Sequence, residues 1–238
     1  MKICLLGYGK MGHEIEIVGK ERGHQFTLII DENNPEDLNS GKLTGIDAVI
    51  NFSTPNTAPD QILTCLENGI PVVSGTTGWN HRFDEVRNRC TNLNGAFFYA
   101  SNFSIGVNIF FNANQHLARI MKRFDDYMVS LKEIHHTQKL DAPSGTAITL
   151  AEDIIAQSDR IKEWELDGKV KKGSLAIESI REGDVKGFHQ VKYESDIDEI
   201  LISHSAKSRK GFALGAVLAA EFIQGKTGSF GMNDLLNL

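Results

Sequence analysis

Short apolar runs alternate with helical patterns through the first hundred residues of the chain. Continuous apolar segments lie at residues 3–6, 26–30, 48–52, 71–74 and 96–100. Runs of this kind are typical of strands that are buried on both faces, as in a parallel sheet. The segments at residues 57–68 and 80–89 have the spacing of amphipathic helices. Repeated strand–helix units predict an α/β fold with a doubly wound parallel sheet.

The pattern changes after residue 103. Residues 107–122 have the period of a long amphipathic helix, and residues 127–135 alternate as a strand with one buried face. The predicted apolar face of the helix comprises Ile109, Phe110, Ala113, Leu117, Ile120 and Met121. One face of the strand comprises Tyr127, Val129, Leu131, Glu133 and His135. With further strands predicted at residues 174–181, 190–194 and 197–205, this half is expected to be α+β, with a sheet covered on one face.

A helix predicted at residues 209–225 is rich in small and apolar side chains, which suits packing against the first half of the chain. We therefore expect two domains. The first spans residues 1–103 and is completed by residues 209–238, and the second spans residues 104–208.

Composition narrows the class of protein. The 238 residues carry a net charge of −6 with a pI near 5.8, so we expect no nucleic-acid partner. Cys4, Cys65 and Cys90 have no CxxC spacing, which predicts neither a metal site nor a disulfide framework. No apolar run is long enough to span a bilayer, and no signal peptide precedes the first strand. We expect a soluble, cytoplasmic protein without a membrane partner.

The sequence GYGKMG at residues 7–12 directly follows the first strand and opens the first helix. This is the context of the dinucleotide-binding fingerprint, in which the backbone approaches a pyrophosphate at a helix N-terminus. It predicts a Rossmann-type domain that binds a nicotinamide dinucleotide. The expected contacts are Gly7, Tyr8, Gly9, Lys10, Met11 and Gly12. The alternative is a glycine turn with only a structural role.

Asp31 ends the second strand, about twenty residues beyond the glycines, where an acidic side chain binds the ribose hydroxyls of the cofactor. A carboxylate repels a 2′-phosphate, and the following residues, Glu32-Asn33-Asn34-Pro35, include no arginine. The sequence therefore favours NADH over NADPH. The alternative is that Asp31 only caps the next turn.

Two further loops follow the strands at residues 71–74 and 96–100. Ligands of doubly wound sheets lie at the carboxyl ends of the strands, so these loops are expected to bound the nicotinamide end of the cofactor. The predicted contacts are Gly75, Thr76, Thr77, Ala100, Ser101, Asn102 and Phe103. Each loop taken alone fits an ordinary turn equally well.

The stretch EIHHTQKLDAPSGTA at residues 133–147 concentrates groups that can transfer protons. His135 and His136 stand at a strand end, Lys139 follows in a loop, and Ser144 precedes a helix predicted at residues 147–157. Imidazole suits general acid–base catalysis, and the N–H groups of a helix N-terminus favour anions. The stretch predicts a site that protonates a substrate while holding its carboxylate. Asp141 either orients Lys139 or caps the turn, and capping is favoured.

Each residue of this stretch also has a structural interpretation. A lone histidine is usually structural, Lys139 alone fits a solvated surface position, and Ser144 alone fits an ordinary helix cap. The pairing of His135 with His136, close to a lysine and a helix N-terminus, favours the catalytic interpretation.

Together, GYGKMG at 7–12, SGTTGW at 74–79, ASNFSIGVN at 100–108 and EIHHTQKLDAPSGTA at 133–147 resemble the 4-hydroxy-tetrahydrodipicolinate reductase (dihydrodipicolinate reductase) family. The order of the motifs matches, and the resemblance covers essentially the whole chain. It implies a two-domain, usually homotetrameric enzyme of lysine and diaminopimelate biosynthesis. Such an enzyme reduces a cyclic dicarboxylate imine with NADH or NADPH and loses water.

The resemblance also implies residue roles. His135 resembles the family's proton donor or acceptor and Lys139 its proton donor, whereas His136, Gly145 and Thr146 resemble substrate-binding positions. The second domain is then the substrate-binding and tetramerisation domain. Many family members carry a longer segment and an arginine after the acidic residue. Both are absent after Asp31, which marks a compact variant and keeps NADH as the expected cofactor.

Two other functions share parts of this pattern. Another two-domain NAD(P)-dependent dehydrogenase would have the glycine loop but no reason for the His-His…Lys…Pro-Ser-Gly-Thr run. A non-catalytic NAD-binding regulator would need a partner surface or a basic face, and the sequence shows neither.

Overall fold

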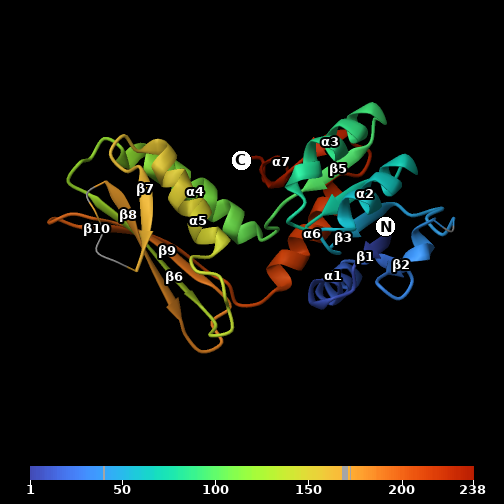
Figure 1. Ribbon diagram of the computed structural model, residues 1–238, viewed down its shortest axis with the longest axis horizontal. Coiled ribbons are helices and arrows are strands. Elements are labelled where there is room, and N and C mark those ends of the chain that lie inside the picture. The colour runs from blue at the N-terminus through green and yellow to red at the C-terminus, as the bar shows by residue number, and fades with distance from the viewer. Residues whose placement is uncertain (40, 168–170, 172) are drawn as a thin grey trace. The chain divides into compact units, whose positions relative to one another are not determined.

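The computed structural model describes residues 1–39, 41–167, 171 and 173–238, and the chain forms two compact units (Figure 1). One unit comprises Met1–Ile105 with Arg209–Leu238, and the other comprises Gly106–Ser208. The C-terminal segment therefore returns to the unit in which the chain begins.

The first unit contains a six-stranded parallel sheet in the order β11-β5-β4-β3-β1-β2. Its strands are β1 (Lys2–Leu6), β2 (Gln25–Ile30), β3 (Ala48–Asn51), β4 (Val72–Ser74), β5 (Ala96–Tyr99) and β11 (Gly228–Phe230). Successive residues of β1 enter opposite cores, with Ile3 and Leu5 in one and Cys4 and Leu6 in the other. Burial on both faces explains the continuous apolar runs and confirms the predicted doubly wound α/β fold.

Helices cover both faces of this sheet. They are α1 (Lys10–Glu21), α2 (Ala58–Glu67), α3 (Phe83–Asn92), α6 (Lys210–Phe222) and α7 (Met232–Leu236), with 3-10 turns η1 (Pro35–Asn39) and η2 (Asn80–Arg82). Helices α1 and α6 share one core, and α2 and α3 share the other (Figure 1). The three cysteines are free and buried, and burial raises the pKa of Cys4 to about 12. Cys4 is therefore an apolar packing group rather than a reactive thiol.

Backbone hydrogen bonds tie the carboxyl ends of neighbouring strands in the first unit together. Gly7 N–H donates to Ile30 O and Phe52 N–H donates to Leu6 O, each at 2.8 Å. Farther along the sheet, Gly75 N–H donates to Asn51 O at 2.9 Å and Ala100 N–H to Ser74 O at 3.3 Å. Each loop is thus anchored to the adjacent strand at its first residues, which aligns the predicted cofactor loops along one edge.

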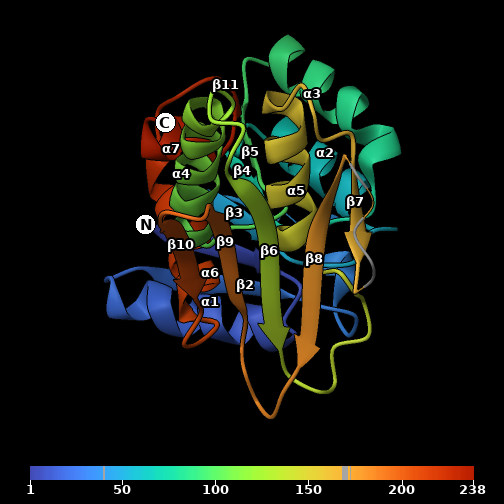
Figure 2. The same cartoon turned by 90° about the vertical axis from the view of Figure 1, so that its left-hand side faces the viewer.

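The second unit contains a mixed five-stranded sheet in the order β10-β9-β6-β8-β7. Its strands are β6 (Met128–His135), β7 (Glu163–Leu166), β8 (Ser174–Arg181), β9 (Phe188–Glu194) and β10 (Glu199–Ser205). Two helices, α4 (Ile105–Met121) and α5 (Gly145–Gln157), lie on one face of the sheet (Figure 2). This is the predicted α+β unit with a sheet covered on one face.

The register of the second sheet brings polar residues of three strands together. On the central strand β6, Glu133 lies opposite Ser179 of β8 and His189 of β9, and His135 lies opposite Arg181. Alternate residues of a strand share a face, so these five side chains point to the side that carries α4 and α5.

The predicted apolar face of α4 is partly wrong. Ile109 and Ile120 are 50% and 45% exposed, whereas Asn114 is fully buried. The buried stripe runs through Val107, Phe110, Asn114, Ala118 and Met121. Asn114 occupies a core position because its amide donates to Leu150 O of α5 at 3.1 Å, which offsets the cost of burying it.

Three short elements were missed at the level of sequence: β7, β11 and α7. Each has three to five residues, too few for a periodic pattern to be distinguished from a loop. Within the described residues, no helix is long and apolar enough to cross a membrane.

Candidate active site

The glycine loop of the first unit has the geometry that a close ligand approach requires. Gly7 has a φ of +90°, and a Cβ there would lie 2.2 Å from Phe52 O. A Cβ on Gly12 would lie 2.5 Å from Gly7 O, so this glycine lets α1 pack on the loop. A Cβ on Gly9, in contrast, would meet no atom within 4 Å. The first and third glycines are needed by the fold itself, and the second faces open space, as the fingerprint expects.

The N-terminus of α1 is suited to an anion. Gly9 occupies the N-cap without a side-chain hydrogen bond, and the first turn, which begins with Lys10 and Met11, contains no acidic residue. Tyr8 stacks on His13, with ring centroids 3.9 Å apart, and its hydroxyl donates to Glu16. The helix dipole and its free first-turn amides therefore favour a phosphate at this position. A dinucleotide fits these residues.

Asp31 follows β2 and lies beside this loop, because Gly7 donates to Ile30 O. Its Oδ1 accepts hydrogen bonds from the backbone and side-chain nitrogens of Asn33, at 2.8 and 3.0 Å. The carboxylate thus caps the turn, as the structural interpretation expects. The same bonds hold it at the strand end, where the cofactor interpretation also requires it.

The two remaining loops contain both buried and exposed positions. Thr76 is 6% exposed, and its hydroxyl donates to Asn51 Oδ1 at 2.9 Å, whereas Thr77 is exposed. Gly75 is required because a Cβ there would lie 2.3 Å from the Phe52 ring. In the loop after β4, Gly75 and Thr76 can contact a ligand through their backbone, and Thr77 can also contact it through its side chain.

The loop after β5 also contains both buried and exposed positions. Ala100 and Phe103 are buried, and Phe103 packs in the core against Phe52 and Phe98, at centroid distances of 5.6 and 5.7 Å. Ser101 is exposed, and Asn102 Oδ1 accepts from Ser104 N at 2.9 Å. Only the backbone at Ala100 and Phe103 is available to a ligand.

Asn51 and Phe52, which follow β3 between the predicted loops, were not among the predicted site residues. Asn51 is fully buried and holds Gln61, Ser53 and Thr76, and Phe52 packs against Gly7 and Gly75. Their position after a central parallel strand, at the same edge as the glycine loop, was the signal that could have identified them.

In the second unit, Glu133, the first residue of the 133–147 motif, is a fully buried carboxylate. The Ser144 N–H lies 3.1 Å from each of its oxygens, and the Ser179 hydroxyl donates to Oε1 at 2.6 Å. The nearest guanidinium nitrogen of Arg181 is 3.4 Å away. Burial alone would raise the pKa of Glu133, but hydrogen bonds from His189, Ser144 and Ser179 outweigh it and hold the pKa well below its usual range. Glu133 is therefore ionised.

His135 is 7% exposed and lies beside this carboxylate, with Nδ1 3.6 Å from Glu133 Oε2. Burial, together with the nearby His189, Lys139 and Arg181, lowers the pKa of His135 to about 4, although the Glu133 carboxylate acts in the opposite direction. The imidazole is therefore neutral near pH 7. Gly187 approaches the other side of the ring, since a Cβ there would lie 3.3 Å from Nε2.

His136 and Lys139 belong to the loop that follows β6. His136 is half-buried, whereas His135 before it is buried. Lys139 Nζ lies 2.8 Å from both oxygens of Asp141. The prediction that Asp141 caps the turn is wrong in this respect, because its carboxylate instead pairs with Lys139 and orients it. Arg181 fixes the backbone of the loop that carries Lys139, because its guanidinium donates to Asp141 O at 2.6 Å and to Lys139 O at 3.3 Å.

The N-terminus of α5 is capped by Ser144, as the structural interpretation of this residue expects, and the helix begins at Gly145 rather than at the predicted Ala147. The Ser144 hydroxyl accepts from Ala147 N at 3.2 Å and lies 3.0 Å from His189 Nε2. Among the described residues, we find no acceptor for the N–H groups of Gly145 and Thr146. Gly145 is exposed, so its amide can receive a carboxylate at the positive end of the helix.

In the second unit, Glu133 and Arg181 link His135, the backbone of Lys139 and Ser144. The predicted positions His136, Gly145 and Thr146 directly follow His135 and Ser144 in sequence. Sequence reasoning missed the roles of Glu133, Ser179, Arg181 and His189, which surround them. The available signal was an acidic residue on the otherwise apolar face of a strand.

One cluster in the described part of the chain has metal-ligand spacing. Donor atoms of Glu133, His135 and His189 all lie within 4.8 Å of one another. The Glu133 oxygens already accept from Ser144 and Ser179, and Arg181 supplies a positive charge. A cation would have to displace these partners, so the donor set fits a hydrogen-bonded carboxylate better than a metal ligand.

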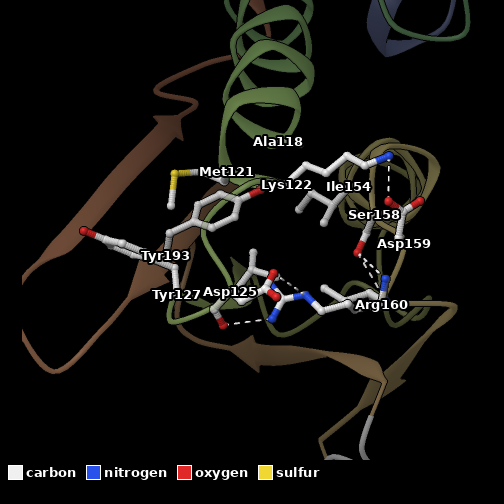
Figure 3. Close-up of a pocket in the computed structure, with 12 residues that line it drawn as sticks. Ala118, Met121, Lys122, Asp125, Tyr127, Ile154, Ser158, Asp159, Arg160 and Tyr193 are labelled. Carbon is white, nitrogen blue, oxygen red and sulfur yellow. Dashed lines mark hydrogen bonds and ion pairs between the residues drawn. The ribbon is translucent and has the colours of Figure 1, made fainter.

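A separate pocket of about 210 Å³ lies between the ends of α4 and α5 (Figure 3). Its charged side chains are paired with each other or with backbone, Lys122 with Asp159 at 2.9 Å and Arg160 with Asp125 O at 2.8 Å. None of the predicted site residues lines it. We therefore place the candidate site at the carboxyl end of β6 and not in this pocket.

Comparison with protein families gives two matches that together span nearly the whole chain. Residues 1–103 match the family description "Dihydrodipicolinate reductase, N-terminus", and residues 106–236 match "Dihydrodipicolinate reductase, C-terminus".

Comparison with individual proteins gives the same family. The chain is 50% identical over 238 residues to the 4-hydroxy-tetrahydrodipicolinate reductase of Christiangramia forsetii, covering 100% of this chain and 98% of the relative. It is 32% identical over 245 residues to the enzyme of that name from Alkaliphilus oremlandii, covering 98% of each. A solved structure, the dipicolinate-bound dihydrodipicolinate reductase from Paenisporosarcina sp. TG-14, has the same fold, with a TM-score of 0.79, 21% identity and 97% coverage of each chain.

Acidification is expected to destabilise the protein through His135. The pKa of this histidine is lowered from 6.5 to about 4 in the folded state, so the unfolded state binds more protons between these values. The free energy of unfolding therefore falls as the pH drops through this window, by about 2–3 kcal/mol for this group. Urea unfolding at a series of pH values measures the loss.

The variant His135→Gln should lose less stability over the same pH range, because its side chain does not titrate. His116→Gln, at an exposed position of α4, is the matched control and should behave as the wild type. Equal acid sensitivity of His135→Gln and the wild type would contradict the buried, neutral state of His135.

Proposed function

The chain belongs to the dihydrodipicolinate reductase family, and we propose that His135 and Lys139 are the catalytic groups of its reaction. That reaction is the NAD(P)H-dependent reduction of 4-hydroxy-tetrahydrodipicolinate to tetrahydrodipicolinate, with loss of water, in lysine biosynthesis. Family membership excludes the two alternatives, an unrelated two-domain dehydrogenase and a non-catalytic regulator. The observation that carries the proposal is that Glu133 lies beside His135 and the N-terminus of α5 and is linked through Arg181 to the backbone of Lys139.

We propose that His136, Gly145 and Thr146 bind the carboxylates of the substrate. The exposed amide of Gly145 and the adjacent Thr146 lie at the positive end of a thirteen-residue helix. This arrangement favours a carboxylate through both hydrogen bonds and the helix dipole. The dipicolinate bound by the Paenisporosarcina relative is a ring dicarboxylate of the same chemical class. Fixing both carboxylates orients the ring for the transfer of hydride and proton.

We propose that Lys139 donates a proton and that His135 accepts this proton or relays it to the substrate. Asp141 orients the Lys139 ammonium through two 2.8 Å contacts. His135 is buried and neutral near pH 7, which makes its free nitrogen an acceptor. A bound dicarboxylate adds negative charge near the imidazole and so favours its protonated form during the reaction. Proton delivery at this position balances the addition of hydride to the conjugated ring carbon.

The first unit is proposed to bind the cofactor, through residues 7–12, Asp31, residues 75–77 and residues 100–103. The open face of Gly9 and the uncapped N-terminus of α1 fit a pyrophosphate. NAD(P)H supplies the hydride when it is bound. Residues 1–103 with 209–238 thus form the proposed dinucleotide-binding domain, and residues 104–208 form the substrate-binding and tetramerisation domain.

We propose that the protein is a cytoplasmic homotetramer that assembles through the uncovered face of the second sheet. This face is opposite to α4 and α5 and carries exposed apolar side chains, with Met128 75% and Leu201 48% exposed. Charged residues flank them, and Lys132 pairs with Glu178 across β6 and β8 at 3.2 Å. A mixed apolar and charged sheet face is suited to association between copies of a chain.

Activity is tested with the product of the preceding synthase as substrate and NADH as reductant, followed by the loss of NADH absorbance. His135→Gln and Lys139→Ala should each lower kcat by about 10²- to 10⁴-fold, because each removes a proton-transfer group. Binding of NADH should not change, since both residues belong to the other unit. His116→Gln is the control. Unchanged turnover in both catalytic variants would refute their roles.

Cofactor preference is tested by comparing kcat/KM for NADH and NADPH. We expect NADH to be preferred, because the Asp31 carboxylate repels a 2′-phosphate and is fixed by Asn33. Asp31→Asn should improve the NADPH-to-NADH ratio about tenfold, whereas Glu36→Gln, an exposed acid in the same segment, should not. A wild-type preference for NADPH would overturn this expectation.

Assembly is tested by light scattering coupled to gel filtration. The wild type should elute as four copies, and Leu201→Glu should reduce the mass, because it places a charge on the proposed interface. Ile17→Glu is a matched control, at a helix position of the first unit with 47% exposure against 48% for Leu201. A monomeric wild type would rule out the proposed interface.

A further inference from the structure

We propose that Glu133 is the positioning residue of the active site, and that it holds His135, the loop that carries Lys139 and the N-terminus of α5 in one arrangement. This inference rests on the roles proposed above for His135, Lys139, Gly145 and Thr146. It assigns no contact with the substrate to Glu133, which is fully buried.

The first link runs from Glu133 to the carboxylate-binding end of α5. Both carboxylate oxygens lie 3.1 Å from the N–H of Ser144, the residue directly before Gly145 and Thr146. The Ser144 hydroxyl then reaches Ala147 N and His189 Nε2. Because Ser144 is held through its backbone and its side chain, the position of the next two amides follows from that of the carboxylate.

The second link runs to the lysine loop through Arg181. One guanidinium contacts Glu133 Oε1 at 3.4 Å and donates to the carbonyl oxygens of Asp141 and Lys139. The Ser179 hydroxyl donates to the same carboxylate oxygen and accepts from Arg181 at 2.9 Å. The carboxylate therefore orients the guanidinium that fixes the backbone on both sides of residue 140.

The third link runs to the catalytic imidazole. Glu133 Oε2 is 3.6 Å from His135 Nδ1, and it is the negative group among the charged neighbours of this ring, the others being His189 of β9, Lys139 of the loop and Arg181 of β8. A carboxylate beside Nδ1 favours the tautomer with its proton on that nitrogen. The Nε2 atom is then left as the acceptor on the side of Gly187.

A packing role alone would not require a charge at this position. An unpaired buried carboxylate is strongly destabilising, and apolar residues of similar volume often replace a buried ion pair without loss of stability. Glu133 is retained between three donors from two segments, Ser144 before α5 and Ser179 and Arg181 of β8, which are eleven to forty-eight residues away in sequence. Both segments carry or hold groups of the proposed site, which points to positioning.

The test compares Glu133→Gln with the wild type. Glutamine has the same size but brings N–H donors toward Ser144, Ser179 and Arg181, which are donors themselves. We expect kcat to fall about 100-fold through misplacement of the reacting groups, with the KM for NADH unchanged within about twofold. Glu152→Gln, which removes an exposed carboxylate from α5, is the matched control and should leave both unchanged.

Two readouts do not depend on turnover. The dissociation constant of dipicolinate, measured by calorimetry, should rise at least about tenfold in Glu133→Gln, because Gly145 and Thr146 lose their fixed position. The ring-nitrogen NMR shifts of His135 at neutral pH should move from the Nδ1–H tautomer toward the Nε2–H tautomer. Dipicolinate affinity and tautomer like those of the wild type would overturn the inference.

Ser179→Ala provides the second variant if Glu133→Gln does not fold. It removes one hydroxyl and leaves the carboxylate, and it should weaken dipicolinate binding and lower kcat by a smaller factor, about three- to tenfold. Wild-type values in all readouts would overturn the inference. A wild type that binds dipicolinate but does not oxidise NADH would instead refute the proposed function, and the affinity and tautomer measurements would still decide the role of Glu133.

Discussion

The second unit depends on the hydrogen bonds that Glu133 accepts inside the sheet. A carboxylate without access to water is strongly destabilised unless donors replace its hydration. Here hydrogen bonds from His189, Ser144 and Ser179 outweigh the effect of burial and keep the pKa of Glu133 well below its usual range, and Arg181 lies close by as a positive charge. The strand order makes this possible, because β6 lies between β8 and β9 and their registers place Ser179 and His189 on either side of Glu133.

The same interaction determines the state of His135. Burial of the ring lowers its pKa to about 4, helped by His189, Lys139 and Arg181 and opposed by the ionised carboxylate of Glu133. A histidine in this environment stays neutral and is ready to accept a proton at physiological pH. Lys139, oriented by Asp141, occupies the complementary position of a donor. Neighbouring side chains thus support the proposed division of acid and base roles between two residues only four apart in the chain.

The proposed binding sites of the two units use different chemical groups. The first uses backbone: glycines at positions 7, 9 and 12, loop N–H groups tied to adjacent strands, and a helix N-terminus without a side-chain cap. Backbone donors suit phosphate groups, which carry charge and little distinctive shape. The second unit adds ionisable side chains on a rigid sheet, because proton transfer needs groups with tuned pKa values held in place. This contrast explains why Thr76 and Phe103 are buried although their loops belong to the predicted cofactor site.

Local patterns allowed much of this to be predicted. Continuous apolar runs determined the parallel sheet of the first unit, since only strands covered on both faces need them, and the spacing of Gly7, Gly9 and Gly12 determined the turn into α1. The motif at residues 133–147 likewise placed His135, Lys139 and the α5 cap in one region. The helical period of α4 was correct, but its buried face was not, because Asn114 is accepted in the core only through its bond to Leu150 O.

Tertiary structure decided what depends on contacts between distant segments. Arg181 holds the loop of Lys139 and Asp141 because of the order and register of the strands. The same strand order brings Ser179 and Arg181 to Glu133. No local pattern encodes these, because the partners lie up to forty-eight residues apart. The sequence by itself therefore determined most of the elements and the family, and it suggested which residues react. Only the folded sheet decided which carboxylate holds those residues in place, since a buried charge can be satisfied only by the donors that the fold brings to it.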